Sequence, residues 1–296
     1  MATLRWKALT TMILFSPTAK ITIVRCLLAL AFAQNWSIHQ LDVNNAFLHG
    51  DLHKEIYMSP PFGLLRQGES LVCRLNKSLY SLKQASRQWF AKISTAIQTA
   101  GFVQSKADYS LFTHRKGKSF TALLIYVDDI VITGNNMAAI SSLKRFLHSC
   151  FRIKDLGNLK YFMGIEVSRS HKGISLSQQK YALEILKNVG LLGAQPMNFP
   201  MEQNLKLLDK GKLLKDLSQY RRIVGRLIYL TITSPDITYS VHVLSHFMHE
   251  PRKPHMEAAL HVQRYIKGTP DHGLFFSSHH NLALTAYCDL DWEKIA

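Results

Sequence analysis

Two adjacent carboxylates, Asp128 and Asp129, lie in the middle of an otherwise uncharged stretch, LLIYVDDIVITG, at residues 123–134. A segment rich in β-branched and aromatic residues flanks them on each side, and two such segments separated by two residues predict a β-hairpin. Hairpin loops of two residues favour Asn-Gly or Asp-Gly, so an Asp-Asp turn is a poor turn sequence whose like charges repel. The spacing therefore predicts a hairpin whose turn, Asp128–Asp129, serves chemistry rather than folding.

A third carboxylate, Asp42, comes at the end of a predicted strand over residues 36–43. Carboxylates without Lys or Arg close by in the sequence are stabilised when a divalent cation neutralises them. Mg²⁺ prefers oxygen ligands and is commonly held by one or two carboxylates together with substrate phosphates. Two such ions about 4 Å apart suit phosphoryl transfer, because one activates the attacking oxygen and the other stabilises the leaving one. The alternative is that Asp128 and Asp129 are solvated turn residues.

The charge of the chain favours a polyanionic partner. Its 296 residues carry 36 Lys and Arg against 20 Asp and Glu, a formal net charge of +16. Residues 1–120, 121–215 and 216–296 carry net charges of +10, +6 and zero, so the basic excess belongs to the first two-thirds. This distribution indicates nucleic acid ahead of a membrane surface, with ordinary solubility charge as the alternative.

Several other classes of protein are disfavoured. The four cysteines show no C-x-x-C spacing, so they indicate neither a zinc site nor a disulfide framework, and they fit a reducing compartment. The apolar run at residues 26–33 is far too short for a membrane span, and no clean cleavage site follows the basic start. We expect a cytoplasmic or nuclear protein without a signal peptide or transmembrane segment.

The elements that must position the carboxylates predict an α+β fold. Helices mixed with antiparallel hairpins in the first 180 residues are typical of that class. The apolar residues of the helix expected over 78–101 fall at three- and four-residue spacings, and Gly101 ends it. The predicted helices are 21–34, 44–50, 78–101, 137–150 and 181–190. A strand is predicted over 36–43, and hairpins are predicted over 123–134 and 161–178. Residues from 216 onward are predicted to be mostly helical until a strand over 282–292.

Two tempting motifs are better explained without chemistry. RKGKS at 115–119 is similar to a phosphate-binding loop, but Phe112 stands where that motif needs its first Gly, so a β-turn is expected. His242 and His246 have a four-residue spacing without an H-E-x-x-H pattern, which predicts a packed or solvated helix rather than a metal site.

Nine blocks of the sequence occur in the order and spacing of one family. They are FSPTAKITIVRCLLALA (15–31), HQLDVNNAFLHGDLHKEIYM (39–58), VCRLNKSLYSLKQASRQWF (72–90), GFVQSKADYSLF (101–112), LLIYVDDIVITGN (123–135), KDLGNLKYFMGIEV (154–167), ISLSQQKY (174–181), YRRIVGRLIYLTITSPDITYSV (220–241) and RYIKGTPDHGL (264–274). On these blocks the chain resembles the reverse transcriptase of copia-type LTR retrotransposons, over about residues 14 to 296.

This resemblance implies a right-hand polymerase palm with partial fingers and thumb, followed by a connection segment and a truncated RNase H start. The parts it implies are a divergent or truncated fingers region (1–35), a palm with fingers insert and primer-grip hairpin (36–180), a thumb-like segment and linker (181–215), the connection segment (216–281) and the start of an RNase H domain (282–296).

The resemblance also implies roles for the three carboxylates. Asp42, Asp128 and Asp129 match the family's catalytic residues, which hold two Mg²⁺ ions or alternatively Mn²⁺, with the Val43 carbonyl as a further ligand. The primer 3′-hydroxyl would attack the α-phosphate of an incoming deoxynucleotide and release pyrophosphate. The implied partners are an RNA template, a DNA primer or hybrid, and deoxynucleotides, with no membrane; the oligomeric state is not predicted.

Further roles follow from the same resemblance. Phe47 matches the bulky residue under the sugar, where its ring excludes a 2′-hydroxyl, and Gln84 matches a residue that lines the nucleotide pocket. The alternatives are helix packing for Phe47 and an exposed helical Gln for Gln84. Met163 and Gly164 match the hairpin that grips the primer strand, and Asp289 matches the first metal carboxylate of an RNase H remnant.

Some positions depart from the family pattern. Ser81 and Ser86 stand where the family has Gly and Pro, and only Arg5 and Lys7 stand in place of a basic fingers strand. Two hypotheses therefore remain. The first is an RNA-directed DNA polymerase whose activity is impaired by N-terminal truncation, and the alternative is a catalytically dead retroelement remnant that at most binds nucleic acid.

Overall fold

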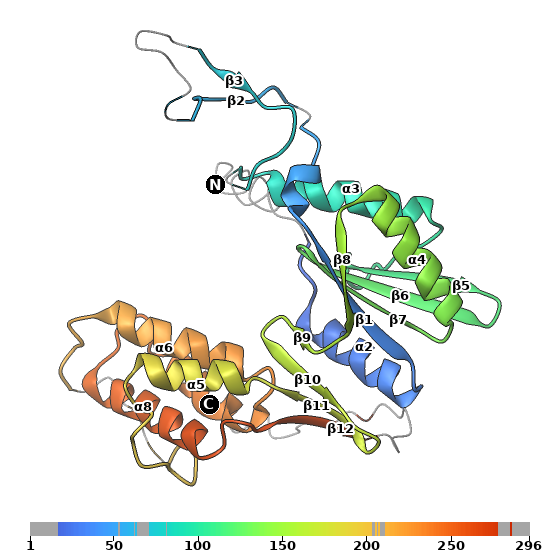
Figure 1. The fold of residues 1–296 in the computed structure, drawn as a ribbon. Coiled ribbons are helices and arrows are strands. Elements are labelled where there is room, and N and C mark those ends of the chain that lie inside the picture. Colours follow the sequence, from blue (N-terminus) through green and yellow to red (C-terminus); the bar gives the residue numbers. More distant parts are fainter. Residues whose placement is uncertain are drawn as a thin grey trace, which may run out of the picture. The chain divides into compact units, whose positions relative to one another are not determined.

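A computed structural model of the chain describes residues 17–52, 54–61, 63, 71–80, 82–202, 205, 207, 211–277 and 285 (Figure 1). Contacts divide the chain into two compact units, of which the first comprises Met1–Leu159 with Asn281–Ala296 and the second Lys160–His280. Both units combine helices with antiparallel strands, which confirms the predicted α+β class. Asp289 and the predicted strand over 282–292 lie outside the described residues, apart from residue 285.

The first unit is built on a six-stranded antiparallel sheet with the strand order β4-β5-β6-β7-β1-β8. Its hairpin strands β6 and β7 lie beside β1, a strand from much earlier in the sequence. This placement brings the end of β1 to the tip of the hairpin (Figure 1). The strands are β1 (Ser37–Val43), β4 (Val103–Gln104), β5 (Leu111–Lys116), β6 (Ser119–Tyr126), β7 (Asp129–Gly134) and β8 (Ile153–Asn158).

One hydrophobic core joins the sheet to two helices, α3 (Ala85–Thr99) and α4 (Met137–Cys150). Alternate residues of a strand point to the same face, so apolar residues at every second position of β1, β6 and β7 bury together. The members of this core that come from the three strands are Leu41, Val43, Leu123, Ile125, Ile130 and Ile132, and those from the two helices are Trp89, Ile93, Ile97, Ile140, Leu143 and Leu147.

Helix α3 begins later than the predicted helix over 78–101. Leu82 N donates to Leu79 O at 3.1 Å and Ala85 N to Leu82 O at 3.0 Å, and such bonds to the third residue back close turns rather than an α-helix. The apolar spacing of Leu79 and Leu82 therefore belongs to turns. The unit also contains α2 (Ile21–Ala33), η1 (Ala46–His49) and a separate two-stranded arm of β2 (Tyr57–Met58) and β3 (Cys73–Arg74).

The second unit combines a four-stranded antiparallel sheet, in the order β12-β11-β10-β9, with four α-helices that share one core. Ala182 and Ile185 of the first helix pack with Tyr220 and Val224 of the next, on either side of the predicted boundary at residues 215 and 216, which stays a prediction. The elements are β9 (Tyr161–Phe162), β10 (Ile165–Arg169), β11 (Gly173–Ser177), α5 (Gln179–Asn188), α6 (Leu217–Leu230), η2 (Pro235–Ile237), α7 (Thr238–Ser245), α8 (Lys253–Gly268) and β12 (Gly273–Ser277).

Among the described residues, no helix combines the length and the apolar composition that a membrane crossing requires.

Candidate active site

The turn of the β6–β7 hairpin lies one residue earlier than predicted. Tyr126 pairs with Asp129, so the two loop residues are Val127 and Asp128, and the predicted turn at Asp128–Asp129 is wrong. Val127 has a φ of 57°, in the left-handed region that normally favours Gly and costs a β-branched residue about 1–3 kcal/mol. Counting Val127 as a strand residue caused the error, because its side chain gives no sign of the strained backbone.

The shifted turn makes Asp129 the first residue of β7, directly opposite Asp42 on β1. Side chains opposite one another in an antiparallel pair lie on the same face, with Cβ atoms about 4.5–5.5 Å apart. Asp128 precedes them in the loop, and its carbonyl accepts a hydrogen bond from Val43 N at 2.9 Å. The structure thus brings together the three carboxylates that the sequence singled out, and all three are half-buried.

Asp129 carries the electrostatic consequence of this arrangement. Burial raises the pKa of Asp129 above its ordinary value, and the negative charges of Asp128 and Asp42 raise it further. A hydrogen bond from Gln40 Nε2 to Asp129 Oδ1, 3.0 Å long, acts in the opposite direction because it favours the charged form. The ion pairs of the described residues include none of these carboxylates, so no Lys or Arg neutralises them there.

These donors suit a hard divalent cation. Carboxylate oxygens are the ligands that Mg²⁺ prefers, and its sites are usually completed by water and substrate phosphates rather than by protein alone. In the part of the chain that the structure describes, no group of three His, Cys, Asp or Glu side chains is arranged so that it could hold a metal ion. Asp42, Asp128 and Asp129 are half-buried oxygen donors that the ion pairs of the described residues leave unneutralised.

Two side chains that the sequence did not single out hold the hairpin. Gln40 is buried and bonds Asp129, and Trp89 of α3 donates its indole N–H to Val127 O at 2.7 Å. Gln40 could have been found, because it lies two residues before Asp42 and alternation places both on one face of β1. Nothing in the sequence marks the indole bond of Trp89, since the apolar spacing of α3 predicts a core residue there.

The predicted nucleotide-pocket residues lie near the ends of η1 and α3. Phe47 is partly buried against the core of the first unit, and its ring centroid lies 4.9 Å from that of Tyr80. Gln84 is half-buried before α3, where its carbonyl accepts Gln88 N at 3.0 Å. Their contacts with a nucleotide stay predictions.

Met163 and Gly164 form the loop between β9 and β10 in the second unit, and both have positive φ, 49° and 70°. The hydroxyl of Tyr229, on α6, donates to Met163 O at 2.5 Å, and a Cβ added to Gly164 would lie 3.0 Å from that hydroxyl oxygen. A side chain at this position would therefore be disfavoured both by the backbone conformation and by the close approach of Tyr229. The role of this loop as a primer grip stays a prediction.

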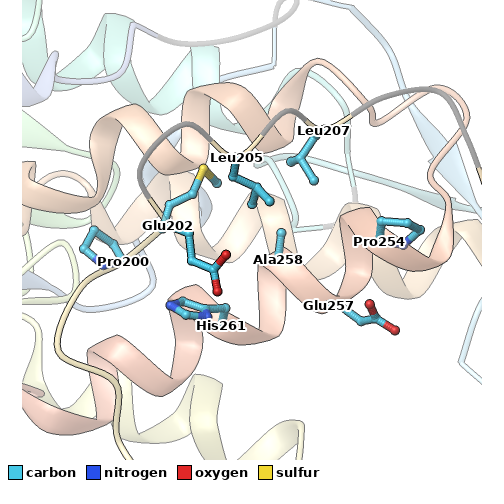
Figure 2. A pocket seen from close by; sticks show the side chains of 9 residues that line it. Pro200, Glu202, Leu205, Leu207, Pro254, Glu257, Ala258 and His261 are labelled. Atoms are coloured by element: carbon cyan, nitrogen blue, oxygen red, sulfur yellow. The ribbon is translucent and has the colours of Figure 1, made fainter.

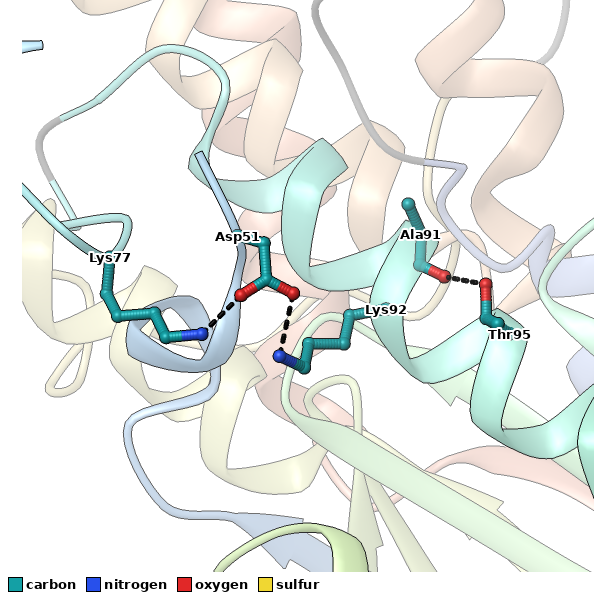
Figure 3. Close-up of polar contacts among 5 residues, drawn as sticks. All are labelled: Asp51, Lys77, Ala91, Lys92 and Thr95. Atoms are coloured by element: carbon teal, nitrogen blue, oxygen red, sulfur yellow. Dashed lines mark hydrogen bonds and ion pairs between the residues drawn. The ribbon is translucent and has the colours of Figure 1, made fainter. Parts of the chain in front are cut away.

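A charged cluster links the base of the β2–β3 arm to α3 (Figure 3). Asp51 forms ion pairs with Lys77 and, at 2.7 Å, with Lys92 of α3. The hydrogen bond from Lys77 and then that from Lys92 lower the pKa of Asp51. About half of the Asp51 side chain is exposed, so these pairs are screened and contribute little stability.

Two hollows have linings that include none of the predicted site residues. The first, of about 580 Å³, is lined by Asp51, residues of α3 between Gln88 and Ala96, Cys150 and Phe151. The second, of about 240 Å³, lies in the second unit between the segment that contains Pro200 and helix α8 (Figure 2). Neither hollow is lined by a residue that the sequence predicted to act.

Comparison with known proteins supports one family. The model of the family described as reverse transcriptase (RNA-dependent DNA polymerase) matches residues 9–203. The Retrovirus-related Pol polyprotein from transposon RE2 of Arabidopsis thaliana is 45% identical over 280 residues, which are 94% of this chain and 19% of that protein. The corresponding polyprotein from transposon TNT 1-94 of Nicotiana tabacum is 37% identical over 292 residues, 94% of this chain and 22% of that protein.

A shorter relative is covered almost fully. A transposon Ty5-1 protein of Saccharomyces cerevisiae is 31% identical over 253 residues, 84% of this chain and 82% of that protein. By contrast, the chain spans about a fifth of the length of the two Pol polyproteins. The match over 9–203 includes all three carboxylates, and the chain therefore belongs to the reverse transcriptase family of copia-type retrotransposon Pol polyproteins.

Proposed function

We propose that this chain is an RNA-directed DNA polymerase domain and that Asp42, Asp128 and Asp129 are its catalytic carboxylates. The observation that carries the proposal is the pairing of Asp42 with Asp129 at the ends of adjacent strands, next to Asp128 in the loop. Such a pairing places like charges together, which destabilises the apo protein unless the charges serve a cation. Family membership supplies the reaction class.

The three carboxylates and the Val43 carbonyl would hold two Mg²⁺ ions, or Mn²⁺ ions. When bound, the metal would activate the attacking hydroxyl and neutralise charge on the phosphates. The chain itself must keep Asp129 ionised despite its raised pKa, and the amide of Gln40 serves that purpose by hydrogen bonding the charged form. In the reaction, the primer 3′-hydroxyl would lose its proton to solvent, its oxygen would bond to the α-phosphorus of a deoxynucleotide, and the bond between that phosphorus and the pyrophosphate oxygen would break.

Other parts of the chain would bind the substrates. The basic excess of residues 1–215 suits an RNA template paired with a DNA primer, because each neutralised phosphate releases counterions. Phe47 would exclude a 2′-hydroxyl, Gln84 would line the nucleotide pocket, and the Met163–Gly164 loop would hold the primer. The six-stranded sheet would belong to the palm, residues 181–215 would form a thumb-like segment and linker, and residues 216–281 would form the connection segment.

A catalytically dead domain that at most binds nucleic acid is the second candidate. It is favoured by Ser81 and Ser86, which stand where the family pattern has Gly and Pro. Both candidates predict binding to an RNA–DNA hybrid, so binding does not separate them. Only the polymerase predicts chemistry that depends on a divalent metal.

The test is extension of a DNA primer annealed to an RNA template, with a single complementary deoxynucleotide and purified protein. The polymerase predicts a product one nucleotide longer that forms with Mg²⁺ or Mn²⁺ and is absent with a chelator. Hybrid binding measured in the same preparation serves as the folding control. Binding without any metal-dependent product would establish the second candidate.

A further inference from the structure

Three successive residues of the β6–β7 hairpin each accept a hydrogen bond from outside the hairpin. Val127 O accepts from Trp89 Nε1 at 2.7 Å, and Asp128 O accepts from Val43 N at 2.9 Å. Asp129 Oδ1 accepts from Gln40 Nε2 at 3.0 Å. Two of these donors come from β1, and Trp89 is the donor that comes from a helix. The hairpin tip that carries Asp128 and Asp129 is thus held from two separate elements, β1 and α3.

The bond from Trp89 falls at the strained residue of the loop. Val127 has positive φ, and a residue in such a conformation persists only where its surroundings fix it. Because Val127 lies in the loop, its carbonyl is outside the ladder of pairs that ends at Tyr126 and Asp129. The indole has a single N–H donor, and a buried Trp normally directs it to a polar partner. Here that partner is the strained carbonyl.

Trp89 is itself firmly placed. Its side chain is 1% exposed, and its ring packs edge-on against Phe151 with centroids 5.1 Å apart. A Cβ added to Gly50 would lie 3.1 Å from the backbone nitrogen of Trp89, so the preceding chain also approaches α3 closely. A donor held this rigidly can impose a backbone conformation on the loop that it contacts.

We propose that Trp89 is a positioning residue whose indole N–H fixes the Val127 turn and thereby the placement of Asp128 and Asp129. This inference rests on the proposed function, because it assigns Trp89 a part in ordering those carboxylates for the metal and the reaction. Loss of the N–H should loosen the hairpin tip, weaken Mg²⁺ binding and slow the chemical step. Hybrid binding and KM for the deoxynucleotide should change little, because Trp89 is buried in the core and reaches the turn only through a backbone carbonyl.

The test replaces Trp89 in the full chain by 3-benzothienylalanine, which keeps the shape of the indole and has sulfur in place of the N–H. Trp89→Phe is the second variant, for the case in which the first cannot be produced folded. Ile97→Val is the matched control. Ile97 lies on the same helix and is fully buried in the same core, and its side chain has no hydrogen-bond donor that could reach the turn.

Three measurements are made on each protein. Hydrogen exchange of residues 123–134 should be about tenfold faster in the isostere than in wild type, because the loop opens more often. The rise in melting temperature produced by Mg²⁺ should shrink, and kcat should fall about tenfold at unchanged KM, the factor expected for one buried hydrogen bond. Ile97→Val should lower the melting temperature while leaving these three quantities at their wild-type values.

The outcomes separate this inference from the proposed function. If the isostere matches Ile97→Val in exchange, Mg²⁺ response and kcat, Trp89 is a packing residue and the inference is overturned. If wild type itself shows neither a Mg²⁺ response nor extension, the proposed function fails, and the inference fails with it as a statement about catalysis. In that case the exchange measurement still decides whether Trp89 fixes the turn.

Discussion

Mg²⁺ should stabilise this protein through Asp128 and Asp129, and the size of the effect can be worked out in advance. A site with a dissociation constant of about 1 mM gains about 1.4 kcal/mol at roughly 10 mM Mg²⁺. For a unit of about 150–250 residues this corresponds to a rise of about 3–6 °C in melting temperature. Replacing both residues by Asn should abolish the rise and leave the apo protein as stable or slightly more stable, because the repulsion around Asp129 disappears.

The pH dependence of this rise follows from the raised pKa of Asp129. A raised pKa in the folded protein favours protonation, and the stability that it contributes at low pH is lost as the pH increases through the folded pKa. Mg²⁺ requires the ionised form, so its stabilising effect should shrink as the solution is acidified. In Gln40→Leu, the stabilising effect of Mg²⁺ should begin to shrink at a higher pH during acidification. The reason is that the hydrogen bond that favours the charged form of Asp129 is gone.

The assay is thermal unfolding followed by circular dichroism over a Mg²⁺ titration, at neutral and acidic pH. Asp155→Asn is the matched control, since Asp155 lies on β8 of the same sheet and already pairs with Lys144 at 2.8 Å. Its Mg²⁺ response should equal that of wild type. A Mg²⁺ response that persists in the Asp128→Asn, Asp129→Asn double variant would refute the assignment of these residues as ligands.

Three further predictions concern the nucleotide, the nucleic acid and pH. Phe47→Ala should raise ribonucleotide incorporation relative to deoxynucleotide incorporation, measured by competitive primer extension, and an unchanged ratio would remove Phe47 from the sugar pocket. The affinity for an RNA–DNA hybrid should decrease steeply as the salt concentration increases. If Lys83 contacts a phosphate, Lys83→Gln should reduce the slope of log affinity against log salt concentration by about 0.9, whereas Lys253→Gln should leave that slope unchanged. Burial lowers the pKa of His39 and of His49 below the ordinary His value of 6.5. The free energy of unfolding, measured by urea titration, should therefore decrease as the pH falls below 6.5, and this decrease should be smaller in His49→Asn.

Patterns of local sequence predicted much of the frame around the site. The predicted strand over 36–43, the second strand of the hairpin over 123–134 and the predicted helix over 137–150 correspond to β1, β7 and α4, whose bounds the structure confirms within one or two residues. The turn within RKGKS is also confirmed, because Lys116 pairs with Ser119 and leaves Gly117 and Lys118 in the loop. These elements follow from side-chain periodicity and turn chemistry, which are local properties of the chain.

Features that depend on tertiary contacts could not be predicted in the same way. The strained φ of Val127 occurs beside the indole of Trp89, a residue 38 positions away in the sequence. Apolar residues at Leu79 and Leu82 extend the helical pattern, yet hydrogen bonding there closes turns before α3 begins. The shared core of α5 and α6 could likewise not be predicted, because the apolar spacing within one helix does not show which other helix it packs against.

Incorporation of a single deoxynucleotide on an RNA-templated DNA primer, compared between wild type and Asp129→Asn, tests the central claim most directly. Wild type should extend the primer in the presence of Mg²⁺ or Mn²⁺, as should Asp155→Asn. Asp129→Asn should bind the hybrid with wild-type affinity and give no product, and Asp42→Asn should behave in the same way. Extension that survives in Asp129→Asn would contradict the claim that Asp129, opposite Asp42, belongs to the catalytic centre.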